Sequence, residues 1–351
     1  MGDLGLVSRA DQFVFGYDDG HRLLVGSREL PRALMVRLLV ATDAVMTAGC
    51  PPLITGLALP ESAEYAFCVT WADPRAARSG AVCSHVLLVD AASLADPRAV
   101  PTIVGHARNP AGESLDSFAV PASLRDGGEG ARSGFASGHA PSVELLQRCI
   151  QIACRTDGAS VVVHPDLAEA AGAIVAIWSA MWPALRARFS FRTRELAAAE
   201  HSEFALTAAP RLSGGSGLLE RVETPTPRWL EKLAAAVASS ADGGLRSFIE
   251  RFGPNEEPEP ARLRWLAELW AAVAFEDVAG AVEQIETHWP DPSSGTALKQ
   301  ALFGGRSQEC WSLGERERVA ALLGSRHPTW NLGALDLTGR VRALARSAHF
   351  S

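Results

Sequence analysis

The chain opens with two apolar runs separated by a short acidic segment, QFVFGYDDGHRLLVGS at residues 12–27. Asp19-Gly20 stands between the runs, and this dipeptide supplies the positive φ angles of a tight turn, so the stretch predicts a β-hairpin. The next run, ALMVRLLVATDAVM at 33–46, carries aliphatic residues at helical spacing and predicts a helix. Glycine and proline residues that follow it end this pattern.

The following segments have the residue types of strands and helices, interrupted by an irregular region. Aromatic and β-branched residues mark the strands, and an apolar stripe marks the helices. Strands are predicted at 64–71, 81–90, 159–164, 189–193 and 204–209, and helices at 142–154 and 166–187. Residues 97–141 contain several Gly, Pro and Ser residues and predict a long, mobile insertion with short elements.

The last third of the chain has almost purely helical patterns. Helices are predicted at 228–240, 261–275, 278–288, 312–323 and 337–347. Glycines followed by prolines at 211–227 are typical of a linker. We therefore expect an α+β N-terminal domain with a mixed or antiparallel sheet at 1–210, followed by an all-α helical domain at 228–351.

Composition and charge narrow the class of protein. The 351 residues are 47% hydrophobic and 21% charged, as is typical of globular domains. The net charge of -7 argues against a broad basic surface for duplex nucleic acid. The six cysteines form neither a C-x-x-C pair nor a disulfide framework, and the apolar runs are too short to span a bilayer comfortably. We expect a cytoplasmic protein that neither spans a membrane nor binds nucleic acid.

Signatures of cofactor and metal chemistry are absent from the sequence. It contains no phosphate-binding G-x-x-x-x-G-K-[ST] loop, no H-E-x-x-H and no G-x-S-x-G nucleophile elbow. We therefore expect no cofactor and no metal, and we favour a protein that is not an enzyme.

Two groups of residues could nevertheless support acid–base or nucleophilic chemistry. Asp18, Asp19 and His21 lie in the predicted turn, where Asp commonly bonds its own backbone, so turn formation is the competing interpretation. Cys83 and His85 lie two apart on a predicted strand and hence on one face, as a Cys–His dyad would require. The competing interpretation is a core Cys beside a hydrogen-bonded His.

Arginines cluster in the segment WPALRARFSFRTRE. On the predicted strand, Arg192 and Arg194 share one face and the phenylalanines share the other. Arginines on an open face, together with Arg186, could bind phosphate or a partner's carboxylates in a bidentate manner. The alternative is a solvated arginine face over a buried aromatic one.

Three stretches together resemble the bacterial GTPase-associated protein family. They are the opening QFVFGYDDGHRLLVGS, TWADPRAARSGAVCSHVLLVDAASLA at 70–95, and MWPALRARFSFRT at 181–193. The positions that the resemblance emphasises are Gln12, Gly16, Tyr17, Gly20, His21, Arg22, Arg78, Gly80, His85, Trp182 and Arg186. The sequence departs from the family pattern at Ser79, where Pro is expected, and at Arg192, where a small residue, often Cys, is expected. The helical remainder would match the family's middle region by order and composition only.

The resemblance implies a component of a bacterial conflict or anti-phage system that is encoded beside a GTPase, and it implies no known reaction. Our first hypothesis is therefore a non-enzymatic adaptor that docks this GTPase, with an effector protein and self-association as further expected contacts. The residues we expect to bind a partner are His21, Arg22, Arg78, Arg186, Arg192 and Arg194.

Two alternatives belong to other classes of function. The first is a hydrolase or nuclease centred on His21 and His85, with Asp18 or Cys83 as a third group. The second is a sensor of an anionic small molecule. Its arginines would be Arg22, Arg78 and Arg186.

Overall fold

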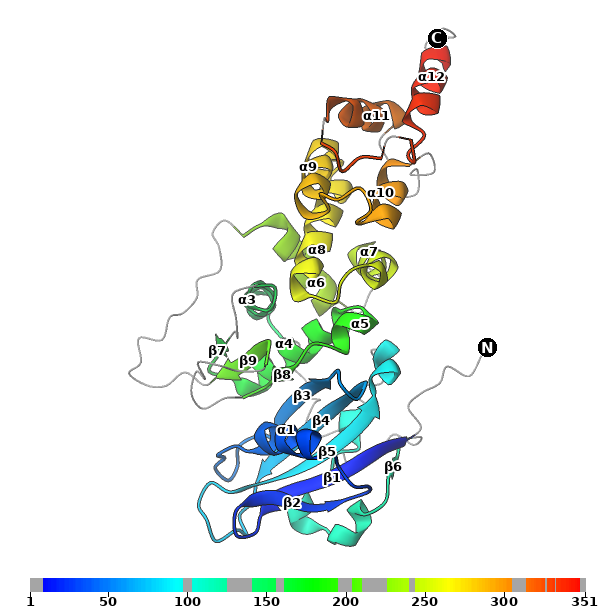
Figure 1. Ribbon diagram of the computed structural model, residues 1–351. Coiled ribbons are helices and arrows are strands. Elements are labelled where there is room, and N and C mark those ends of the chain that lie inside the picture. The colour runs from blue at the N-terminus through cyan, green and yellow to red at the C-terminus, as the bar shows by residue number, and fades with distance from the viewer. Residues whose placement is uncertain are drawn as a thin grey trace. The chain divides into compact units, whose positions relative to one another are not determined.

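The computed structural model describes residues 9–96, 103–124, 141–155, 161–194, 204–209, 226–239, 244–304, 314–325, 327–331 and 333–347. The chain divides into two compact units, Met1–Val222 and Glu223–Ser351. The first is an α+β unit with a mixed sheet and the second is helical (Figure 1), so the predicted fold class is confirmed. Most of the predicted linker lies outside the described residues.

The first unit is built on a sheet whose strands come from distant parts of the chain. Its strands are β1 (Arg9–Tyr17), β2 (His21–Gly26), β3 (Leu53–Leu59), β4 (Glu64–Ala72), β5 (Val82–Asp90), β7 (Val161–Val163), β8 (Phe191–Arg192) and β9 (Leu206–Ala209). Within the described residues the order is β2-β1-β5-β4-β3-β8-β9-β7, and β6 (Ala122–Ser123) pairs with β1 outside this path. Strand β9 pairs in parallel with β7 and β8, whereas the other pairs are antiparallel.

The opening stretch forms the predicted hairpin. Tyr17 pairs with His21, which leaves Asp18, Asp19 and Gly20 in the turn. Asp19 and Gly20 have φ angles of 54° and 125°, so the turn places its positive φ angles on the two residues that the sequence pattern singled out.

One face of the sheet packs against α1 (Arg32–Thr42). Phe13 and Phe15 of β1 meet Leu34 and Leu38 of the helix in a shared apolar core with residues of β3, β4 and β5. The helix ends earlier than the predicted 33–46, because the backbone turns extended after Thr42.

The opposite face is covered by α4 (Leu167–Ala180) and by the short turns η2 (Pro110–Gly112) and η3 (Leu115–Phe118). The Trp178 ring of α4 lies 5.8 Å from that of Tyr65, and Phe118 of η3 lies 4.9 Å from His85. Besides these, the unit contains η1 (Ala91–Ala95), α3 (Val143–Ala153) and α5 (Pro183–Arg186). The helix predicted at 166–187 is two helices, because Pro183 lacks the N–H that would continue α4 and starts α5 instead.

Strand β3 was missed from the sequence. All seven of its residues are buried, so it has no alternation of apolar and polar positions, as is usual for a strand in the interior of a sheet. Gly56 is required there, since a Cβ atom would lie 2.4 Å from the Phe191 ring and from the Tyr65 hydroxyl.

The second unit is helical throughout its described part. Its helices are α6 (Arg228–Ala238), α7 (Gly244–Phe252), α8 (Pro260–Ala274), α9 (Val278–His288), α10 (Thr296–Phe303), α11 (Glu315–Gly324) and α12 (Leu337–Ser347), with the turn η5 (Gly253–Asn255) between α7 and α8. Helices α7 and α10 were not predicted. In the described residues, no helix is both long enough and apolar enough to cross a membrane.

Lys299 ties three segments of the helical unit together. Its ammonium group is buried and donates hydrogen bonds to the carbonyls of Trp289 and Asp291, at 3.0 and 2.7 Å. It also donates to the Thr329 hydroxyl at 2.6 Å. These acceptors are neutral oxygens from two different segments of the chain, so one ammonium group satisfies the hydrogen-bonding needs of both segments.

Candidate functional site

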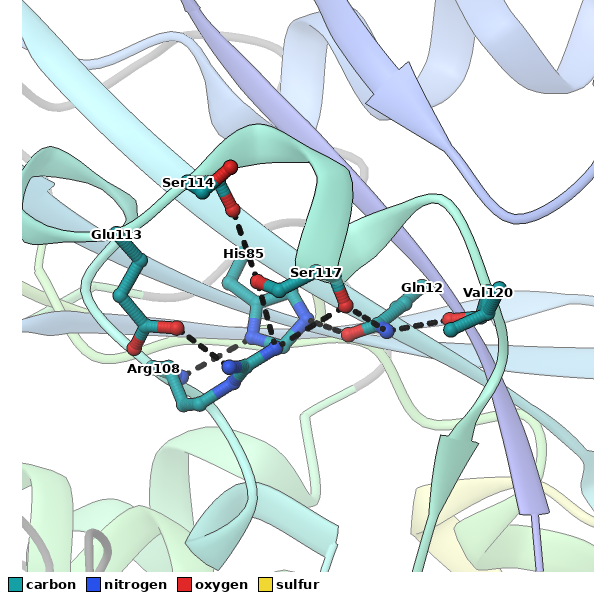
Figure 2. Close-up of polar contacts among 7 residues, drawn as sticks. All are labelled: Gln12, His85, Arg108, Glu113, Ser114, Ser117 and Val120. Atoms are coloured by element: carbon teal, nitrogen blue, oxygen red, sulfur yellow. Dashed lines mark hydrogen bonds and ion pairs between the residues drawn. The ribbon is translucent and has the colours of Figure 1, made fainter.

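His85 lies at the centre of a polar network on the face opposite α1 (Figure 2). The imidazole is fully buried on β5. Its Nε2 lies 3.0 Å from Oε1 of Gln12, and its Nδ1 accepts a hydrogen bond of 3.0 Å from the Arg108 backbone N–H. Because Nδ1 accepts and the Gln12 oxygen can only accept, the proton of the neutral ring belongs on Nε2.

The same network fastens residues 103–124 to the sheet. The Gln12 amide donates to the carbonyls of Ser117, at 3.2 Å, and Val120. The Arg108 guanidinium forms an ion pair with Glu113. This part of the predicted insertion is therefore tied to β1 and β5 by buried polar groups, which differs from the mobile segment expected.

The network makes His85 a poor acid–base catalyst. Burial, aided by the positive charge of Arg108, lowers the pKa of His85 from 6.5 to about 3. The ring therefore stays neutral near pH 7, and both of its nitrogens already have partners. A general base needs a free nitrogen within reach of the proton it removes.

Cys83 shares the face of His85, as its spacing predicted, but the two do not form a dyad. Its thiol donates a hydrogen bond of 3.3 Å to the Asn109 side chain. Burial raises the pKa of Cys83 to about 11, so the thiolate is scarce at neutral pH. Of the two interpretations, the arrangement favours a core Cys beside a hydrogen-bonded His over a Cys–His dyad, because burial suppresses the charged form of both groups.

His21 lies on the other side of the sheet, against α1. Its Nε2 is 2.9 Å from the Thr42 hydroxyl, which itself donates to the Leu38 carbonyl at 2.7 Å, so the imidazole is the donor. The ring stacks beside Phe15 of the core on the α1 side. Burial lowers the pKa of His21, although Asp43 acts in the opposite direction. Because the sheet separates this imidazole from that of His85, the two cannot share one active site.

The hairpin tip carries exposed charged groups. Asp18 and Arg22 form an exposed ion pair across the turn. The Arg78 guanidinium, from the loop between β4 and β5, lies 5.8 Å from the Tyr17 ring centre. The turn interpretation therefore fits Asp18, while Arg22 and Arg78 remain accessible to a partner.

Arg186 does not join these arginines. Its side chain is buried and donates to the carbonyls of Met181, at 2.8 Å, and Ala95, at 3.2 Å. Ala95 follows β5, whereas Arg78 precedes it, so the two guanidinium groups lie at opposite ends of a nine-residue strand. An anion site formed by Arg22, Arg78 and Arg186 together is therefore contradicted.

Arg192 is likewise buried, in place of the solvated arginine face expected. It is 6% exposed, and its Nη2 donates to the carbonyls of Val40, at 3.2 Å, and Ala41, at 2.7 Å. The guanidinium also lies 4.7 Å from the Phe204 ring centre. These carbonyls are among the last of α1, which have no partner within the helix, so Arg192 caps the helix and its charge suits the helix dipole.

Arg194 lies near a cysteine that the sequence analysis overlooked. The Thr47 hydroxyl lies 3.1 Å from the Cys50 sulfur. Hydrogen bonds from Thr47 and then from Arg194 lower the pKa of Cys50, which is partly exposed. No local motif indicates this group, because Arg194 follows β8, which pairs with β3 only in the folded chain.

Among the described residues, no group of three or more His, Cys, Asp or Glu side chains is placed to hold a metal ion. Comparisons with curated proteins and with solved structures found no match to the chain. Residues 9–106, which hold β1 to β5 and α1, match the model of a protein family described as GTPase-associated protein 1, N-terminal domain type 1.

Proposed function

We propose that this chain is a non-enzymatic adaptor of a bacterial conflict system, and that it docks a partner GTPase through its α+β unit. The observation that carries the proposal is the match of residues 9–106 to a domain of GTPase-associated proteins. The matched segment includes five strands and a helix, so it is the structural core of the unit and not an isolated motif.

The chemistry of the candidate catalytic residues supports a role in binding. His85 and Cys83 hold the 103–124 segment, and His21 holds the end of α1. Each of these groups has a structural partner, and burial holds both histidine pKa values below the ordinary value. The candidate catalytic side chains are thus engaged in structural contacts. The matched segment keeps an exposed outer surface, and such a surface suits association with another protein.

The test is co-purification of the full chain with the GTPase encoded beside it, loaded with GDP or with a non-hydrolysable GTP analogue. We expect a stable complex in at least one nucleotide state. Absence of a complex in both states, with an unchanged rate of GTP hydrolysis, would overturn the docking role.

The conflict-system role is tested separately. Cells that carry the complete gene cluster, or the cluster without this gene, are challenged with a panel of phages. We expect plaque numbers to rise when the gene is removed. Equal plaque numbers with every phage would contradict the defence role and leave the docking result intact.

A further inference from the structure

The outer face of α1 is apolar and exposed. Val36 and Val40, one turn apart, are 52% and 57% exposed. Val45 follows the helix, is 55% exposed, and lies against Gly80, where a Cβ atom would be 2.8 Å from its methyl group. We call Val36, Val40 and Val45 the valine face.

This face is unusual for a surface helix because the inner face of α1 is apolar as well. Leu34 and Leu38 are buried in the core below it. A helix that is apolar on both sides is normally covered on both sides. In the helical unit, by contrast, α7 buries its apolar residues and exposes Ser247, Glu250 and Arg251.

Two arginines without a carboxylate partner among the described residues border the valine face. Arg32 begins α1 and is exposed, and Arg78 lies beside Gly80 at the other end. Arg37, between them, is already paired with Glu61 at 3.2 Å. The Arg32 charge opposes the helix dipole, and the first turn of α1 has neither an acidic residue nor a side-chain cap. Carboxylates from a partner would offset this unfavourable charge.

Resting on the proposed function, we propose that the valine face is the surface that contacts the GTPase, and that the GTPase presents an apolar patch bordered by carboxylates. The face lies within the segment 9–106 that matches GTPase-associated proteins. A second copy of this chain fits the face less well. A twofold contact would place its arginine border against an identical one, and like charges repel across an interface.

The test uses the full chain and measures its affinity for the GTPase by titration calorimetry. Val36→Asp/Val40→Asp places two charges in the centre of the contact, so we expect affinity to fall at least about tenfold. The matched control is Val143→Asp/Leu323→Asp, which adds the same charges at two other exposed apolar sites, 42% and 59% exposed, and leaves affinity unchanged.

A second variant keeps the test decisive if the aspartates disturb folding. Arg32→Glu/Arg78→Glu leaves the valines in place and reverses the border charges. We expect weaker binding that added salt no longer weakens, because repulsion replaces the attraction between charges at the interface.

The outcomes separate this inference from the proposed function. If the wild-type chain binds no GTPase, both are overturned. If the wild type binds and both double variants bind equally well, the adaptor role stands and the valine face is not the contact. If Val36→Asp/Val40→Asp converts a wild-type dimer to a monomer in light scattering, the face belongs to a second copy, and the inference is overturned.

Discussion

The buried imidazole of His85 makes acid sensitivity of the α+β unit a direct consequence of its structure. In the native state the pKa of His85 is lowered from 6.5 to about 3, whereas in the unfolded chain it keeps the ordinary value. Between these values the unfolded state binds a proton that the native state does not. Stability is therefore fully present above about pH 6.5 and is lost as the pH falls, by about 1.4 kcal/mol per pH unit.

The expected loss of unfolding free energy can be stated for a pH range that experiments reach. From about pH 6.5 to about pH 5 it is about 2 kcal/mol, and its upper limit near pH 3 is about 5 kcal/mol. His85→Gln removes the titrating group. It leaves the Arg108 N–H without its acceptor, so it should cost about 1–3 kcal/mol at neutral pH. The difference in stability between wild type and variant should then shrink by about 2 kcal/mol by about pH 5.

The assay is urea unfolding of the full chain at several pH values, followed by hydrogen exchange and mass spectrometry. Peptides from β5 report on the α+β unit separately from the helical unit. NMR of isotopically labelled histidine adds a direct measurement, with a neutral ring protonated on Nε2 expected in the native protein at about pH 5. His21 titrates in both proteins, so its contribution cancels in the comparison.

Two results would refute the reasoning. One is a parallel loss of stability in wild type and His85→Gln between about pH 7.5 and about pH 5, which would mean that His85 carries no part of the acid sensitivity. The other is an imidazolium signal from His85 in the native protein over this range. Either result would show that the 103–124 segment does not shield the ring as its contacts indicate.

Three further predictions follow from buried polar groups and thiols. Arg192→Ala should lower the free energy of unfolding by about 3 kcal/mol, because it leaves two carbonyls at the end of α1 unpaired. The exposed control Arg188→Ala should change it by no more than about 0.5 kcal/mol in urea unfolding. Equal effects of the two substitutions would contradict the capping role. Lys299→Met should destabilise the helical unit by about 2 kcal/mol in hydrogen exchange of its peptides, because backbone acceptors lose their donor; an unchanged unit would show that the ammonium group is dispensable. Iodoacetamide at about pH 7.5 should alkylate Cys50 before Cys83, because the pKa of Cys50 is lowered and that of Cys83 is raised to about 11. Peptide mass spectrometry measures the order of alkylation. The reverse order would contradict the surroundings described for both thiols.

Much of the fold could be predicted because it rests on local patterns. The hairpin follows from Asp19-Gly20, whose positive φ angles few other residue pairs adopt readily. Several helices of the second unit follow from apolar spacing. Strand β3 was not predicted because it is buried on both faces and shows no alternation of apolar and polar residues. Helix α7 was missed although its buried residues recur at helical spacing, so a usable signal was present.

The candidate site was predictable only in part, and the arginines show why. Strand geometry correctly placed Cys83 and His85 on one face. It does not determine which elements cover a face, and so it could not show that burial keeps both groups uncharged. Arg192 was expected on an open surface, yet its partners are carbonyls about 150 positions earlier in the chain, at the end of α1.

The sequence by itself determined the opening hairpin, most of the helical segments and which side chains of a strand share a face, because these depend on neighbours a few positions apart. Tertiary structure alone decided which polar groups became buried and which apolar residues stayed exposed. Burial depends on which distant segments cover each face, and burial shifts the pKa values of His21, His85 and Cys83. The same folding that makes Arg192 and His85 structural leaves the valine face of α1 open.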